Sequence, residues 1–146
     1  SSDEYAPILD LLIEEVKQRG HEVRYHGPAQ GENSQDWTTV TLKAAEDVQK
    51  GEAAEGIILC WTGTGCTIIA NKVPAIRAAL CADSETAKGA RIWNHANVLA
   101  LSLRTTSPAI LKEIITAWFE TPYSTDSWNL LQIQRVQEAE TAASPR

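Results

Sequence analysis

The residues best suited to chemistry lie in one short glycine-rich segment, Cys60 to Cys66, with the sequence Cys-Trp-Thr-Gly-Thr-Gly-Cys. A glycine-rich turn that leads from a strand into a helix points backbone N–H groups at an anion, and Gly63 and Gly65 permit close approach. The segment lacks the full Walker pattern and the dinucleotide-binding fingerprint. The anion could be a phosphate or an enediolate oxygen, and glycine spacing alone does not separate the two.

The two cysteines that flank the glycines are candidates for a catalytic base. Cys60 stands where a strand is expected to end and Cys66 where a helix is expected to start, so both thiols could face one cleft. A thiol in such a place can have a lowered pKa and accept a proton. Cysteine also often only fills space in a core, which is the better interpretation of Cys81 in its apolar run. The position beside the glycines favours a function for Cys60 and Cys66.

Composition excludes several classes of function. The net charge is −6 and no cluster of Lys and Arg is present, which argues against a nucleic-acid partner. No apolar run approaches the roughly 20 residues that span a bilayer and no signal peptide is visible, so we expect a soluble, cytoplasmic protein without a membrane partner. The three cysteines and three histidines lack the spacing of a metal site. We therefore expect reduced thiols, no metal and no cofactor.

Strands that alternate with helices are expected to position the glycine-rich segment. Apolar or alternating runs predict strands, at 21–26, 56–60, 76–81 and 98–103. Helical periodicity predicts helices, at 6–19, 36–50, 67–71, 84–90, 108–120 and 126–140, before a frayed tail at 141–146. This order predicts one α/β domain over residues 1–146, a three-layer sandwich with a doubly wound, mostly parallel sheet of Rossmann-like type.

The start of the chain is unusual for such a sheet, because the polar residues Ser1 to Glu4 lead directly into a helix. A doubly wound sheet usually begins with a central strand. Either a short first strand precedes Ser1, or the sheet is built without it. We favour the first, since an empty position would leave backbone groups unpaired in the core.

The segment from Cys60 to Lys72 resembles the signature C-G-T-G-x-G-x-S-I-A-A-N-K of the ribose-5-phosphate isomerase B and galactose-6-phosphate isomerase family. The similarity continues in the same order through Ile76–Cys81, Asn94–Leu99 and Arg104, and it covers nearly the whole chain. Ser2-Asp3 resembles the start of the family motif S-D-H-A-G, which follows the family's first strand. The resemblance implies an aldose–ketose isomerase that moves a proton between C1 and C2 of a sugar phosphate through a cis-enediol. It implies no metal or cofactor, and a site shared between two subunits of a dimer.

The resemblance also implies roles for individual residues. Cys60 matches the family's proton-shuttling base, and Cys66 stands where another branch carries a glutamate base. The amides of the segment would hold the enediolate, from Thr62 through Gly63, Thr64 and Gly65 to Cys66. The remaining matched positions contact the substrate in the family. The resemblance implies that Thr62 positions the sugar ring, that Asp3 and Asn94 bind its oxygens, that Arg104 and Arg135 bind the phosphate, and that Trp37 lines the pocket.

Departures from the family pattern bear on the substrate. Trp93 replaces the histidine that opens the sugar ring, and an indole does not shuttle a proton. Glu4 replaces the histidine of S-D-H-A-G, and the R-H-Q-R-R segment reads Leu131 to Arg135, with one arginine left and the histidine absent. His95 is a candidate substitute acid, or a polar surface or interface residue. A four-carbon ketose phosphate, which never closes into a ring, would need no ring-opening acid.

The sequence is compatible with three functions. The first is an isomerase for a ribose 5-phosphate, ribulose 5-phosphate or tetrose phosphate type of substrate, working as a homodimer or tetramer with Cys60 or Cys66 as base. The second is a catalytically inactive sugar-phosphate-binding or partner subunit of the same fold. A thiol-redox protein is the weakest of the three, because the two loop cysteines lie on opposite sides of the glycines.

Overall fold

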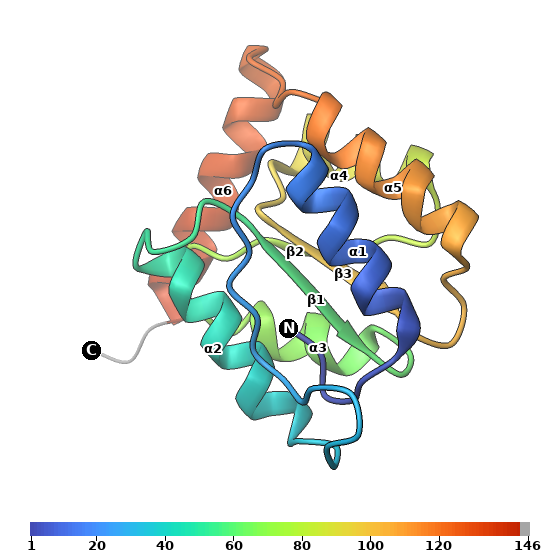
Figure 1. Cartoon of the computed structure of the whole chain (residues 1–146). Helices are drawn as coiled ribbons and strands as arrows, with labels where there is room; N and C mark the ends of the chain where they lie inside the picture. The colour runs from blue at the N-terminus through green and yellow to red at the C-terminus, as the bar shows by residue number, and fades with distance from the viewer. Residues whose placement is uncertain (144–146) are drawn as a thin grey trace.

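Three parallel strands form the centre of the protein in the computed structural model, which describes residues 1–143 (Figure 1). Their order in the sheet is β1-β3-β2, and they are β1 (Gly56–Cys60), β2 (Ala78–Leu80) and β3 (Val98–Ser102). The register pairs Cys60 with Ser102 and Leu80 with Ala100. The carboxyl ends of all three strands therefore meet at one edge of the sheet, which is where ligands bind in open α/β folds.

Helices cover both faces of this sheet (Figure 1). The described residues form six of them, α1 (Pro7–Gln18), α2 (Trp37–Gln49), α3 (Thr64–Ala70), α4 (Ser84–Asn94), α5 (Pro108–Glu120) and α6 (Ser127–Ala143). Helices α1, α4 and α5 pack on one face, α2 and α3 pack on the other, and α6 packs against α4. The expected three-layer α/β sandwich with a parallel, doubly wound sheet is confirmed.

Alternate residues of the central strands serve the two layers of the core. Leu59, Leu99 and Leu101 pack toward α1, α4 and α5, whereas Ile58 and Ala100 pack toward α2 and α3. Every one of these side chains is buried. A strand buried on both faces must be apolar at every position, which explains why the runs at 56–60 and 98–103 show no alternation.

Residues 21–26 form no strand, so that prediction is wrong. The segment keeps its alternating pattern, with Val23 and Tyr25 against the core. Its one backbone hydrogen bond within residues 1–143 runs from the Ser2 amide to the carbonyl oxygen of His26, at 3.1 Å. A β-strand needs a paired neighbour along its length, and this segment has such a neighbour only at its end.

Several predicted boundaries also differ from the structure. Helix α3 begins three residues earlier than predicted and β2 is shorter. Helix α4 continues to Asn94 and stops where His95 adopts a left-handed backbone conformation, with φ of 48°. Helix α6 runs to Ala143, so the first part of the predicted frayed tail is helical, and residues 144–146 lie outside the described part of the chain.

The amino group of Ser1 is buried against the free edge of β1. It donates to the carbonyl oxygen of Ile57 at 2.7 Å, and the Leu59 amide donates to the carbonyl oxygen of Ser1 at 2.8 Å. A parallel bridge pairs Ser2 with Leu59, so the first two residues lie alongside β1 in the manner of a strand.

Candidate active site

The glycine-rich loop leaves β1 at the carboxyl edge of the sheet, as the sequence predicts. Cys60 is the last residue of β1. The next strand, β3, continues into Leu103 and Arg104, whose amides donate to the carbonyl oxygens of Cys60 and Trp61 at 3.0 and 2.9 Å. These bonds fix the backbone of Arg104 beside the loop, and its side chain is exposed there.

Gly63 makes the turn from β1 into α3 possible. Its φ is +76°, in the left-handed region that only glycine adopts at little cost. A Cβ atom here would lie 2.5 Å from Cδ1 of Leu80 and 3.0 Å from the backbone carbon of Leu101. The amides of Thr64 to Cys66 follow in the first turn of α3, before its first intrahelical bond, and are suited to hold an anion.

The two loop thiols are buried beneath this turn and are chemically different. Both are free thiols, with Cys60 6% exposed and Cys66 completely buried. The Cys66 Sγ donates to the carbonyl oxygen of Gly63 at 3.2 Å. Burial, with a smaller contribution from the adjacent Cys60, raises the pKa of Cys66 well above its ordinary value. Cys66 is therefore held as a protonated donor, and Cys60 is the better candidate for a base.

Asp3 and Trp37 border the loop from the N-terminal part of the chain. Burial raises the pKa of the Asp3 carboxyl, which lies close enough to Cys66 to interact with it electrostatically. Among the described residues, Oδ1 of Asp3 is a buried oxygen without a hydrogen-bond partner. The indole of Trp37 lies against Gly65, 3.3 Å from the place of a Cβ atom there. Asp3 therefore offers a substrate a carboxylate oxygen that accepts no other hydrogen bond, and Trp37 forms an aromatic wall beside the loop.

Thr62 and Thr64 form the exposed rim of the loop. Their hydroxyl oxygens lie 2.8 Å apart and share a hydrogen bond. The structure thus brings together most of the predicted site residues, namely Asp3, Trp37, Cys60, Thr62, Gly63, Thr64, Gly65, Cys66 and Arg104.

Asn94 and Arg135 do not join the loop of their own chain. Helix α4 connects the carboxyl end of β2 to the amino end of β3, so its last residue, Asn94, lies at the opposite edge of the sheet. Arg135 belongs to α6, which packs against α4 and whose Glu140 accepts a hydrogen bond from the amide of Ala75, ahead of the amino end of β2. His95 is also at this far edge, where its ring stacks on Tyr123 with 4.6 Å between centroids.

Sequence reasoning missed Ser102, which supports the loop. Its buried Oγ donates to the carbonyl oxygen of Trp61 at 2.9 Å and accepts from the Thr105 amide at 3.2 Å. A serine at the end of an otherwise apolar strand could have indicated this role, because a buried polar side chain needs a hydrogen-bond partner.

No helix within residues 1–143 has the length and apolar character to cross a membrane. The same residues contain no group of three His, Cys, Asp or Glu side chains placed to hold a metal ion. The absence of a cofactor and the cytoplasmic location stay predictions.

Comparisons with known proteins agree with this geometry. Residues 2–137 match the family described as Ribose/Galactose Isomerase. The D-erythrulose-4-phosphate isomerase of Pectobacterium atrosepticum is 39% identical over 117 residues, which cover 80% of this chain and 76% of that protein. The ribose-5-phosphate isomerase B of Escherichia coli is 34% identical over 112 residues, with 77% and 74% covered.

Solved structures show the same relationship. The type B ribose 5-phosphate isomerase of Trypanosoma brucei superposes with a TM-score of 0.85 at 42% identity, over 91% of this chain and 90% of that one. On these grounds the chain belongs to the ribose/galactose isomerase family.

Proposed function

We propose that this protein is an aldose–ketose isomerase for a small sugar phosphate. The observation that carries the proposal is the loop after β1, where Cys60 ends the strand in the same buried cluster as Cys66, and the amides of Thr64 to Cys66 begin α3. An enediol pathway needs a base to take the proton and preorganised donors to stabilise the negative oxygen that develops. The loop supplies both in one place, and relatives named as sugar-phosphate isomerases support the same reaction.

Cys60 is the proposed base. As a thiolate it takes the proton from C2 of the aldose, and the C–H electron pair forms the C1–C2 double bond of the enediolate. The carbonyl electrons move onto O1, which the loop amides hold. The proton then returns to C1 while the O2–H proton passes to O1, and the product is the ketose. Cys66 does not compete for the proton, because its thiol donates to Gly63 and its pKa is raised by burial.

We propose a four-carbon sugar phosphate as the preferred substrate, with ribose 5-phosphate as the second candidate. Trp93 occupies the position of the family's ring-opening histidine, and a four-carbon phosphate has no ring to open. Trp37 against Gly65 adds bulk to the wall of the site. A relative that is 39% identical carries the name D-erythrulose-4-phosphate isomerase, which supports the same choice.

A panel of aldose and ketose phosphates with four to six carbons tests the proposal. We expect tetrulose phosphates to exceed pentose and hexose phosphates in kcat/KM by about tenfold or more, with solvent deuterium incorporated at C1 or C2. Good turnover of pentose or hexose phosphates without turnover of tetrulose phosphates would show the substrate assignment to be wrong. Binding of sugar phosphates with no turnover of any would favour the inactive partner subunit.

We also propose a homodimer in which the two subunits share each site. Large apolar side chains are exposed on α4 and α6, with Trp93 60%, Trp128 67% and Val136 50% accessible. Exposed apolar residues gathered in this way indicate an association surface. Asn94 and Arg135 lie on the same two helices, so a second copy docked there could present them to the loop of the first.

Mixing two damaged subunits tests the shared site. We expect Cys60→Ala and Arg135→Ala proteins, each of low activity alone, to recover about a quarter of normal activity in an equal mixture after subunit exchange. Half of the dimers are then mixed, and one of the two sites in each mixed dimer has both residues intact. A mixture of Cys60→Ala with the Cys60→Ala/Arg135→Ala double variant is the control and should recover nothing. Mixed dimers without recovered activity would contradict the proposal.

A further inference from the structure

The two thiols of the glycine-rich loop lie together in one buried cluster, although glycines separate them in the sequence. Cys60 ends β1 and Cys66 stands in the first turn of α3, and both belong to the apolar layer between the sheet and the helices α2 and α3. The turn at Gly63 brings the end of the strand and the start of the helix together. The side chain of Cys66 is close enough to that of Cys60 to interact with it directly.

The present hydrogen bond of Cys66 is not essential to its acceptor. The Cys66 Sγ donates to the carbonyl oxygen of Gly63 at 3.2 Å. The same oxygen accepts from the Thr67 hydroxyl at 2.6 Å and from the Thr67 amide at 3.3 Å. A buried carbonyl needs a hydrogen-bond partner, and this one keeps the two from Thr67. The sulfur of Cys66 can therefore turn toward Cys60 without leaving a polar group unpaired.

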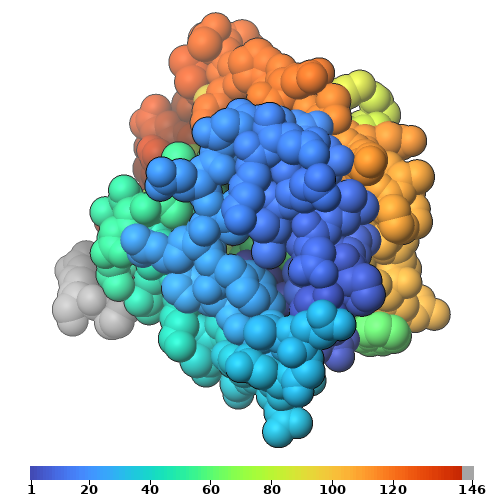
Figure 2. Space-filling view, viewed as in Figure 1, coloured from blue at the N-terminus to red at the C-terminus, as the bar shows by residue number. Residues whose placement is uncertain are grey.

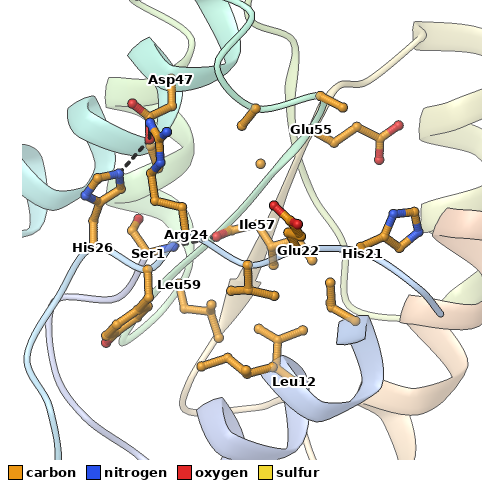
Figure 3. A pocket seen from close by; sticks show the side chains of 18 of the residues that line it. Ser1, Leu12, His21, Glu22, Arg24, His26, Asp47, Glu55, Ile57 and Leu59 are labelled. Atoms are coloured by element: carbon orange, nitrogen blue, oxygen red, sulfur yellow. Dashed lines mark hydrogen bonds and ion pairs between the residues drawn. The ribbon is translucent and has the colours of Figure 1, made fainter. Parts of the chain in front are cut away.

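A small oxidant from solvent meets Cys60 before Cys66. Cys60 is 6% exposed, whereas Cys66 is completely buried. A groove of about 910 Å³ runs between β1 and residues 21–26 (Figure 3), and an opening remains between α1 and the segment that follows it (Figure 2). No cysteine lines this groove. The exposed part of Cys60 therefore lies outside the groove.

We infer that Cys60 and Cys66 are a site of reversible oxidation, where a peroxide converts the two thiols into a disulfide within one chain. The Cys60 sulfur attacks one oxygen of hydrogen peroxide, the O–O bond breaks, and the departing hydroxide takes the thiol proton and leaves as water. Cys60 is then a sulfenic acid, which condenses with a neighbouring thiol. The Cys66 sulfur attacks the Cys60 sulfur, the S–O bond breaks, and the hydroxide leaves with the Cys66 proton as a second water. Two thiols are oxidised, and one peroxide is reduced to two waters.

The disulfide protects Cys60 and also stops its chemistry. A sulfenic acid without a nearby thiol is oxidised further to sulfinic acid, which thiol reductants do not reverse. A disulfide returns to two thiols by exchange with a reducing thiol. While the bond exists, Cys60 cannot accept a proton. The disulfide itself does not depend on the proposed function, and only its effect on isomerisation does.

Cys81 provides an internal comparison. It is also a buried free thiol, 1% exposed, but it belongs to the core cluster on the other face of the sheet. Its sulfur lies 3.6 Å from the carbonyl oxygen of Ala79. Neither of the other two cysteines of the chain belongs to its cluster, so we expect Cys81 to stay a thiol.

Peptide mapping after peroxide treatment tests the disulfide directly. The folded full chain is treated with hydrogen peroxide, then unfolded, blocked with iodoacetamide and digested with trypsin. Cys60 and Cys66 fall on one tryptic peptide, residues 51–72, and Cys81 falls on another, residues 78–88. We expect peptide 51–72 to lose two hydrogen atoms and to take up no iodoacetamide, while peptide 78–88 is alkylated. Dithiothreitol before blocking should restore alkylation at both cysteines of peptide 51–72.

Cys66→Ala and Cys81→Ala separate the roles of the neighbouring thiols. In Cys66→Ala we expect Cys60 to be oxidised to sulfinic acid, whereas Cys81→Ala should behave as the parent does. The fraction of Cys60 that dithiothreitol recovers as thiol should be at least about tenfold higher in the parent than in Cys66→Ala. The peptide map of the parent decides the question even if Cys66→Ala does not fold.

Three results would overturn the inference. One is sulfinic acid at Cys60 of the parent with Cys66 still open to alkylation. Another is a disulfide that joins two chains, seen on a non-reducing gel. The third is an unmodified peptide 51–72 at a peroxide dose that oxidises free cysteine in solution. A disulfide found in a protein that turns over no sugar phosphate would establish the oxidation site and refute only the proposed function.

Discussion

Replacing Cys60 by alanine is expected to lower kcat/KM of the isomerisation by about a thousandfold, since a positioned general base contributes on that order. Cys66→Ala should keep activity within about tenfold of the parent, because its buried thiol donates a hydrogen bond to Gly63 and does not ionise readily. Steady-state rates with the best substrate of the panel, together with solvent deuterium incorporation, measure the difference.

The two variants control for each other. Each removes one sulfur from a buried position next to the same loop, so each leaves a small cavity of similar size and should cost about 1–2 kcal/mol of stability. Thermal unfolding of both proteins checks that neither has lost the fold. Deep loss of activity in Cys66→Ala with retention in Cys60→Ala would reverse the assignment of the base.

We expect Arg91→Ala to lower the free energy of unfolding by about 3 kcal/mol or more. The Arg91 side chain is largely buried and lies 2.8 Å from Oε1 of Glu55. It donates to the carbonyl oxygen of Ala96 at 2.9 Å, and its guanidinium carbon lies 4.8 and 4.3 Å from the ring centroids of Trp118 and Tyr123. Alanine would remove the cation that pairs with Glu55, whose carboxylate would keep only the Trp118 indole N–H at 2.7 Å. The Ala96 carbonyl would keep only the Tyr123 hydroxyl, at 3.1 Å. Urea unfolding at neutral pH measures the loss.

Lys88→Ala is the matched control for Arg91→Ala. Lys88 lies on the same helix and pairs with Glu85 at 2.6 Å, but both side chains are exposed. An exposed pair three residues apart contributes about 0.5 kcal/mol or less. If the two variants lose the same stability, burial of the Arg91 pair is not what stabilises the region.

The elements next to the site were predictable because their signals are local. An apolar run, two glycines and a following helix can be read along the chain, and each of them requires a particular backbone conformation where it stands. The structure places Cys60 at the end of β1 and the left-handed Gly63 at the turn, as expected. Segment 21–26 shows the limit of such reasoning, since its alternation describes which side chains are buried but not whether a neighbouring strand is there to pair with it.

The sequence by itself determined the α/β class, the parallel order of strands and helices, and the loop that carries the candidate chemistry. Only the tertiary structure distinguishes the two thiols, because Cys66 is completely buried and donates to the carbonyl oxygen of Gly63 through a contact in space. It also separated Asn94 and Arg135 from the loop, since α4 and α6 carry them to the opposite edge of the sheet. Burial, pairing and the direction of a helix in space depend on residues distant in the chain, and no local pattern contains them.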